Sequence, residues 1–198
     1  MFILGLTGSI GMGKSATAAM FRAEGVAVFD SDAAVHELYK GRAAAAIEAA
    51  FPGTAGEGVV DRERLAEIVF RDRAGLERLE AIIHPLVAES RDAFLAEAEK
   101  NGAGLVVLDI PLLFETGYDR AVDATVLVSA PKSVQKERVS GRSGMTEERL
   151  AAIMARQMPD AEKRERAHFV IDTGRGFEAA REQVRAILGA LAGARNKA

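Results

Sequence analysis

Two kinds of hydrophobic pattern alternate along the chain. Short runs of consecutive apolar residues are typical of strands that are buried on both faces of a sheet. Longer segments in which apolar residues recur every three or four positions are typical of helices. The runs predict five strands, at residues 2–7, 26–29, 105–110, 124–129 and 169–171. Because helical segments such as 16–24 and 177–191 separate them, we predict an α/β fold with a five-stranded parallel sheet flanked by helices.

Two connections are too long for plain crossover helices. Residues 33–100 are rich in Ala and dotted with charges, and we expect helices there that are interrupted at Pro52-Gly53 and at His84-Pro85. Residues 131–167 are rich in Arg, Lys and Glu, and their pattern predicts two helices, at 132–141 and 146–157. Both segments are therefore interpreted as insertions into the sheet domain.

Composition narrows the class of protein. The 198 residues are 48% hydrophobic, which is enough for a full core, and the net charge of −3 does not favour a nucleic-acid-binding surface. The absence of Cys excludes disulfides, thiol catalysis and thiolate metal sites. We see no apolar run of membrane-spanning length and no leader before the first strand. We therefore expect a cytoplasmic protein that binds neither nucleic acid nor membrane.

The segment from Gly8 to Ser15 fits the phosphate-binding pattern G-x-x-x-x-G-K-[ST] at every fixed position. Glycines let successive backbone N–H groups point at an anion, and the following helix adds its positive N-terminal end. The Lys14 ammonium suits the outer phosphates of a nucleotide, and the Ser15 hydroxyl suits Mg²⁺. A plain glycine-rich turn would need neither side chain. The ATP-binding residues predicted here are Gly8, Gly11, Met12, Gly13, Lys14, Ser15 and Ala16.

Acidic residues follow two of the predicted strands. Ligands of open α/β sheets bind beyond the carboxyl ends of the strands, where Asp30, Asp32 and Asp109 fall. Asp109 resembles the Walker B residue that holds Mg²⁺, here through a water molecule. Either Asp30 or Asp32 suits the carboxylate that orients an acceptor hydroxyl and accepts its proton. The alternative for each is helix capping, and Asp32 stands where a cap for residues 33–39 would be useful.

The second insertion offers cations for phosphoryl transfer. Most of its basic residues are expected to form a solvated helix face. Arg138 and Arg142 lie one helical turn apart and precede Ser143-Gly144, so we predict that they close over the triphosphate as catalytic cations. The three His residues are too scattered to indicate a metal site.

A GTP-dependent switch is the main non-enzymatic alternative. It would need an Asn-Lys-x-Asp motif, but Asn196-Lys197 is followed only by Ala198. It would also be expected to carry Asp-x-x-Gly after a strand, and Leu112 stands where Asp109 would require that Gly. The sequence therefore favours a kinase.

Several motifs in order resemble those of one enzyme family over nearly the whole chain. The opening Gly5–Ser15 segment, Asp30-Ser31-Asp32, Ile83-His84-Pro85, Pro111-Leu112-Leu113-Phe114-Glu115, and Gln157 followed by Phe169–Gly174 are similar to segments of the dephospho-coenzyme A kinases. The Pro111–Glu115 segment is the most diagnostic. The resemblance implies transfer of the ATP γ-phosphate to the ribose 3′-hydroxyl of dephospho-CoA, the last step of coenzyme A synthesis. Another nucleoside or small-metabolite kinase of the same fold is the alternative.

The resemblance also implies an organisation and further site residues. One domain, 1–198, would consist of a nucleotide-binding core (1–32, 101–130 and 168–198), an acceptor-binding insertion (33–100) and an ATP lid (131–167). Asp32 would meet the hydroxyl, and Asp172 and Gly174 would lie near the base. The acceptor would also be contacted by His84, Pro85 and Leu113. The implied partners are ATP, Mg²⁺ and dephospho-CoA, with the protein a monomer or weak homo-oligomer.

Two positions depart from the family pattern. His36 stands where the family often has Arg, four residues after Asp32, and a neutral His would weaken a salt link to acceptor phosphate. Thr173 replaces the commoner Asn, which removes a side-chain amide near the nucleotide base. Neither departure touches the phosphate loop, Asp32 or Asp109.

Overall fold

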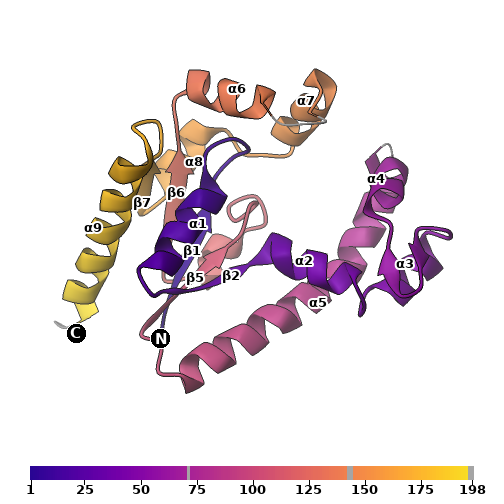
Figure 1. Ribbon diagram of the computed structural model, residues 1–198, viewed down its shortest axis with the longest axis horizontal. Coiled ribbons are helices and arrows are strands. Elements are labelled where there is room, and N and C mark those ends of the chain that lie inside the picture. Colours follow the sequence, from indigo (N-terminus) through magenta and orange to yellow (C-terminus); the bar gives the residue numbers. More distant parts are fainter. Residues whose placement is uncertain (71, 142–144, 196–198) are drawn as a thin grey trace. The chain divides into compact units, whose positions relative to one another are not determined.

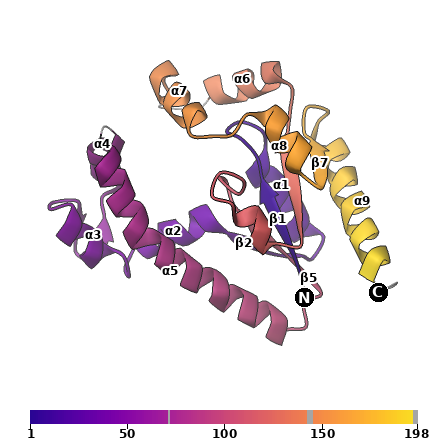
Figure 2. The same cartoon turned by 180° about the vertical axis from the view of Figure 1, so that it is seen from behind.

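The chain forms two compact units. The computed structural model describes residues 1–70, 72–141 and 145–195. One unit comprises Met1–Phe29 and Gly102–Ala198, and we call it the sheet unit. The other comprises Asp30–Asn101, and we call it the helical unit. Figures 1 and 2 show their helices and strands from opposite sides.

The sheet unit is built on a five-stranded sheet in the order β2-β5-β1-β6-β7. β1 pairs in parallel with both β5 and β6, and β6 pairs in parallel with β7. The strands are β1 (Phe2–Thr7), β2 (Ala27–Asp30), β5 (Leu105–Asp109), β6 (Ala124–Ser129) and β7 (Phe169–Asp172). This sheet and its helices confirm the predicted fold class, and each predicted strand boundary holds within one residue.

Helices cover the sheet because each presents an apolar stripe. α1 (Lys14–Ala23) and α9 (Phe177–Arg195) lie side by side in Figures 1 and 2. Phe21 of α1 and Val184 of α9 are fully buried in one core with Leu6 of β1. Such burial stabilises by about 1.5–3 kcal/mol for each large side chain.

The second insertion has one more helix than its pattern predicted. The expected pair is present as α6 (Lys132–Ser140) and α7 (Glu147–Ala155). α8 (Asp160–Arg166) follows, with acidic residues in its first turn and basic residues in its last, which is the arrangement that the helix dipole favours.

A 3₁₀ helix, η1 (Tyr118–Ala121), lies between β5 and β6. Among the described helices, none combines the length and apolar character needed to cross a bilayer.

The helical unit has a hydrophobic core of its own. Its elements are α2 (Ser31–Tyr39), α3 (Ala44–Ala50), β3 (Ala55–Gly56), β4 (Val59–Val60), α4 (Arg62–Phe70) and α5 (Arg73–Lys100). α2, α3 and α4 all pack against α5. Ile47 is fully buried in this core and Leu65 nearly so. The antiparallel hairpin of β3 and β4 was not predicted, because two-residue strands carry no periodic pattern.

The predicted interruption at His84-Pro85 is wrong, because α5 runs through it without a break. Pro85 removes one N–H donor and crowds the preceding turn, at a typical cost of about 3 kcal/mol. Leu79 and Ile83 before it are buried in the core of the helical unit, and Leu86 and Val87 after it pack against the same core. Both halves of the helix are therefore held by packing that offsets the lost hydrogen bond.

The turn that begins at Pro52-Gly53 is closed by Glu48. Its carboxylate accepts hydrogen bonds from the backbone N–H groups of Gly53 and Ala55, both at 2.6 Å. The hydrogen bond from Gly53 and then that from Ala55 lower the pKa of Glu48. A carboxyl group whose pKa is lowered on folding stabilises the fold above its unfolded pKa, and this contribution is lost as the pH falls.

We expect Glu48→Gln to lower the melting temperature at neutral pH. The difference from the unsubstituted protein should shrink as the pH falls below about 4.3, where the unfolded carboxyl group takes up its proton. Thermal melts between pH 7 and pH 3 measure this, with Glu99→Gln at the exposed end of α5 as the matched control. A difference that does not vary with pH would contradict the assigned hydrogen bonds.

Candidate active site

The loop between β1 and α1 has the conformation that its glycines permit. Gly11 and Gly13 have φ angles of 79° and 94°, in the left-handed region that side chains rarely adopt. A Cβ at Gly11 would also lie 2.6 Å from a methyl group of Val139 on α6. At Gly8 it would lie 2.7 Å from the carbonyl oxygen of Val128. The loop therefore approaches β6 and α6 closely, and the space suits backbone only.

Lys14 and Asp109 form an ion pair at the carboxyl edge of the sheet. Lys14 Nζ lies 2.7 Å from Asp109 Oδ1, and these side chains are 13% and 1% exposed. The pair follows from the register, because Asp109 ends β5 opposite Leu6 of β1. Ser15, in the first turn of α1, is exposed to solvent. The ammonium group of Lys14 is thus held against a buried carboxylate.

The oxygen donors at this edge fit a magnesium ion bound together with a nucleotide. Mg²⁺ prefers oxygen ligands and is usually held by one or two protein groups, the substrate phosphates and water. The Ser15 hydroxyl and the Asp109 carboxylate can supply oxygen ligands of this kind. Over the described ranges, no three His, Asp or Glu side chains gather into a group that would hold a metal by themselves.

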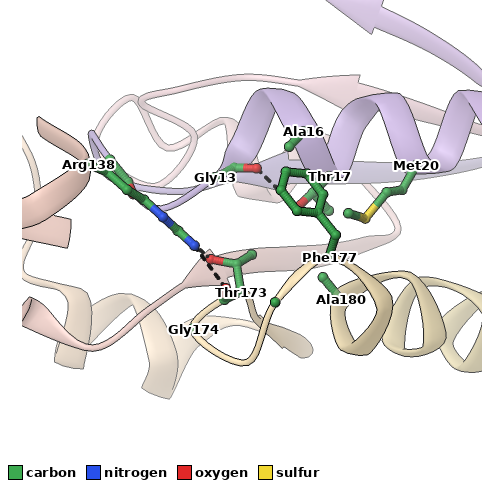
Figure 3. Close-up of a pocket in the computed structure, with 11 residues that line it drawn as sticks. Gly13, Ala16, Thr17, Met20, Arg138, Thr173, Gly174, Phe177 and Ala180 are labelled. Carbon is green, nitrogen blue, oxygen red and sulfur yellow. Dashed lines mark hydrogen bonds between the residues drawn. The ribbon is translucent and has the colours of Figure 1, made fainter. Parts of the chain in front are cut away.

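A pocket of about 410 Å³ opens between α1, α6 and α9. Five of the predicted residues line it: Gly11, Gly13, Ala16, Arg138 and Gly174. The apolar side chains of Met20, Phe177 and Ala180 also line it, and the sequence did not indicate them. Figure 3 shows Phe177 reaching from the start of α9 toward α1, with Arg138 at the opposite side. Pockets of this volume take small-molecule ligands.

Arg138 is fixed by hydrogen bonds to the loop after β7. Its Nη1 donates to Thr173 Oγ1 at 2.8 Å and its Nη2 donates to the Thr173 carbonyl at 2.9 Å. The Thr173 hydroxyl in turn donates to the Met12 carbonyl at 2.7 Å. Thr173, the departure from the family pattern, therefore links the phosphate loop to α6. The expectation that this departure leaves the phosphate loop untouched is wrong, because the Thr173 hydroxyl contacts the loop at Met12. A catalytic role for Arg138 stays a prediction. To contact the triphosphate, Arg138 would have to exchange its hydrogen bonds to Thr173 for hydrogen bonds to phosphate oxygens.

Several of the predicted site residues make hydrogen bonds or packing contacts with other parts of the protein. Asp172 Oδ1 accepts from the N–H of Gly174 at 2.8 Å and so closes the turn that follows β7. Met12 is buried, and its sulfur accepts from the N–H of Ala130 at 3.2 Å. Leu113 is fully buried against Gly5, so its part in acceptor binding stays a prediction. Arg142 lies outside the described residues.

The remaining predicted residues belong to the helical unit. Asp32 is in the first turn of α2, and His84 and Pro85 are in α5. The cap of α2 is Asp30, whose Oδ1 accepts from the N–H of Ala33 at 3.0 Å. Capping, the alternative role considered for Asp32, is therefore filled by its neighbour.

A second set of contacts ties the phosphate loop to the insertion and was not predicted. Gln157 Oε1 accepts from the N–H of Ile10 at 3.2 Å, and Gln135 Nε2 donates to the carbonyl of Ile10 at 2.8 Å. The next residue, Met158, donates its N–H to Glu115 Oε1 at 2.8 Å. Lys163, fully buried, lies 2.8 Å from the same oxygen. Gln157 and Glu115 both belong to the motifs that resemble the family. Their place in those motifs is the sequence feature that could have indicated a functional role for these contacts.

We expect Thr173→Val to raise the KM for ATP and to lower stability by about 1–3 kcal/mol, since the variant leaves the Met12 carbonyl without its donor. Valine has the shape of threonine without the hydroxyl, so packing is kept. Initial rates against ATP concentration and thermal melts measure the two effects. Thr173→Ser keeps the hydroxyl and should restore both, and a Val variant with normal KM would show that the link to Arg138 is dispensable.

The fold and the phosphate loop together identify the broad class of protein to which this chain belongs. A parallel sheet with a phosphate-binding loop after β1, and a lysine paired to an acid on the neighbouring strand, is the architecture of the P-loop kinases. Shikimate kinase from Aquifex aeolicus VF5 has a similar fold, with a TM-score of 0.54 at 16% identity over 98% of each chain. That likeness concerns the fold alone.

The comparison with protein families is more specific. The family model described as Dephospho-CoA kinase matches residues 2–178. The dephospho-CoA kinase of Mesorhizobium japonicum is 60% identical over 195 residues, covering 98% of this chain and 99% of the relative. That of Nitrobacter winogradskyi is 56% identical over 192 residues, covering 97% and 96%. A crystal structure of a Thermus thermophilus protein superposes with a TM-score of 0.82 at 38% identity, covering 96% and 97%. The chain belongs to the dephospho-CoA kinase family.

Proposed function

We propose that the protein transfers the γ-phosphate of ATP to the ribose 3′-hydroxyl of dephospho-CoA, giving coenzyme A and ADP. The observation that carries the proposal is the Lys14–Asp109 pair at the end of a phosphate loop, in a chain that belongs to this kinase family. The reaction is an in-line transfer that the protein helps mainly by positioning and by charge.

The donor half of the site lies in the sheet unit. Backbone N–H groups from Gly11 to Ser15 hold the β-phosphate, and Lys14 reaches the β- and γ-oxygens while Asp109 supports it. The nucleoside enters the 410 Å³ pocket, with Gly13 and Ala16 at the phosphate end and Gly174 near the base. The carboxylate of Asp172, which holds the turn before Gly174, keeps that wall in place.

Mg²⁺ is the proposed cofactor. When bound, it neutralises charge that develops on the transferred phosphoryl group. The Ser15 hydroxyl would be a direct ligand, and Asp109 would hold a bound water.

The acceptor half is proposed to come from residues 33–100 together with Asp32. Asp32 orients the 3′-hydroxyl and accepts its proton or its hydrogen bond. His84, Pro85 and Leu113 contact the remainder of the acceptor. Residues 131–167 act as a lid whose Arg138 and Arg142 close over the triphosphate and exclude water. The protein works as a monomer or weak homo-oligomer.

The test is a coupled assay for ADP formation with ATP, Mg²⁺ and dephospho-CoA, run beside adenosine and AMP as acceptors. We expect the highest kcat/KM with dephospho-CoA, and 3′-phosphorylated product by mass. Preferential phosphorylation of another acceptor would overturn the proposal in favour of a different small-metabolite kinase of this fold.

A further inference from the structure

Three side chains of α2 form one stripe with a cation from α4. Asp32, His36 and Tyr39 are spaced four and three residues apart, so they share a face of the helix. Arg62, the first residue of α4, reaches this face and places its Nη1 3.1 Å from His36 Nδ1. All four residues belong to the helical unit.

The direction of this hydrogen bond follows from the chemistry of the two groups. A guanidinium has only donors, so His36 Nδ1 accepts from Arg62. His36 therefore acts as an anchor that aims the guanidinium. Burial raises the pKa of Tyr39, and the charge of Arg62 opposes part of that rise.

Among the described residues, Arg62 differs from most arginines of the helical unit in having no acidic partner. Carboxylates pair with Arg42, Arg73, Arg78 and Arg91. For Arg62, no carboxylate oxygen lies within 4.0 Å in the part of the chain that the structure describes. Its side chain is exposed, so the cation keeps donors available to a ligand. An arginine fork of this kind suits a phosphate oxygen pair.

We propose that Arg62, aimed by His36, binds the phosphate nearest the ribose of the acceptor. The inference rests on the proposed function, since it uses Asp32 as the residue that meets the 3′-hydroxyl. Four residues of helix rise separate Asp32 from His36 by about 6 Å. One ribose carries both the 3′-hydroxyl and the 5′-phosphate, so the two groups can be read by two successive turns of α2.

The proposal accounts for the departure at His36. An arginine at that position would carry the phosphate-binding charge on α2 itself. Here the charge comes from α4, and the residue on α2 supplies a hydrogen-bond acceptor instead. The salt link to acceptor phosphate is thus kept through a different side chain.

The test compares Arg62→Ala with Arg64→Ala, an exposed arginine of the same helix that lies against Gly53 instead. Loss of a hydrogen bond to a charged group should raise the KM for dephospho-CoA about tenfold to a hundredfold in Arg62→Ala. The KM for ATP should stay unchanged, as should kcat/KM with adenosine, which has no phosphate. Arg62→Lys should recover part of the loss, because it restores the charge without the fork.

Two results would overturn the proposal. One is an unchanged KM for dephospho-CoA in Arg62→Ala, and the other is an equal loss with adenosine. Melting temperatures establish that each variant is folded. Calorimetric titration of dephospho-CoA and of adenosine, with the donor site filled by a non-hydrolysable ATP analogue, gives a readout that does not need turnover. Should the unsubstituted protein fail to phosphorylate dephospho-CoA, the proposed function falls, and this titration still decides whether Arg62 binds the phosphate.

Discussion

Lys14→Met is expected to lower kcat by about 10²–10³-fold, the loss typical when one preorganised donor to a developing charge is removed. The Lys14 ammonium would contact the transferred phosphoryl group, where negative charge is concentrated in the transition state. Methionine keeps the length and apolar stem of the side chain and removes only its charge. Initial rates at saturating ATP and dephospho-CoA measure the effect, and Lys100→Met at the exposed end of α5 serves as the matched control.

The same substitution also takes the lysine away from the buried Asp109 carboxylate, so stability must be separated from catalysis. Lys14→Arg keeps a positive charge beside Asp109, and its melting temperature should stay close to that of the unsubstituted protein. Its turnover should still be strongly reduced, because a planar fork replaces a compact ammonium. Normal turnover in the Met variant would remove Lys14 from the mechanism.

The sheet could be predicted from the sequence because its strands are buried on both faces. Mostly apolar runs such as residues 105–109 and 124–129 fit few structures other than buried strands. The hairpin of β3 and β4 could not be predicted, since each strand is two residues long and the turn before β3 is closed by hydrogen bonds that the N–H groups of Gly53 and Ala55 donate to Glu48. Nor could the continuity of α5 through Pro85, which depends on packing by helices distant in the sequence.

In the donor site, too, some features could be predicted from the sequence and others could not. The phosphate loop is local, and its spacing alone predicts the chemistry of Lys14 and Ser15. The pairing of Lys14 with Asp109 spans 95 residues and follows from strand order, which the pattern of apolar runs does not specify. The link from Thr173 to Met12 spans 161 residues, so the sequence indicates only that Thr173 lacks the amide of Asn. Contacts between distant segments are where the structure adds most.

Asp32→Asn is expected to lower kcat by about 10²–10⁴-fold, the usual contribution of a positioned general base. The amide keeps the size of the carboxylate but cannot accept the proton of the 3′-hydroxyl. The Kd for ATP should not change, because the donor half of the site is assigned to the sheet unit. Single-turnover formation of coenzyme A and calorimetric titration of ATP measure the two quantities.

Asp30→Asn is the matched control, two residues away and identical in chemistry. Asp30 accepts the capping hydrogen bond from the N–H of Ala33, and asparagine caps helices as well as aspartate does. The control should therefore retain both stability and turnover. Because Asp30 accepts the capping hydrogen bond of α2, we assign the acceptor hydroxyl to Asp32. A large loss in Asp30→Asn with little loss in Asp32→Asn would exchange the two roles, and near-normal turnover in both would leave the hydroxyl proton to solvent or to ATP itself.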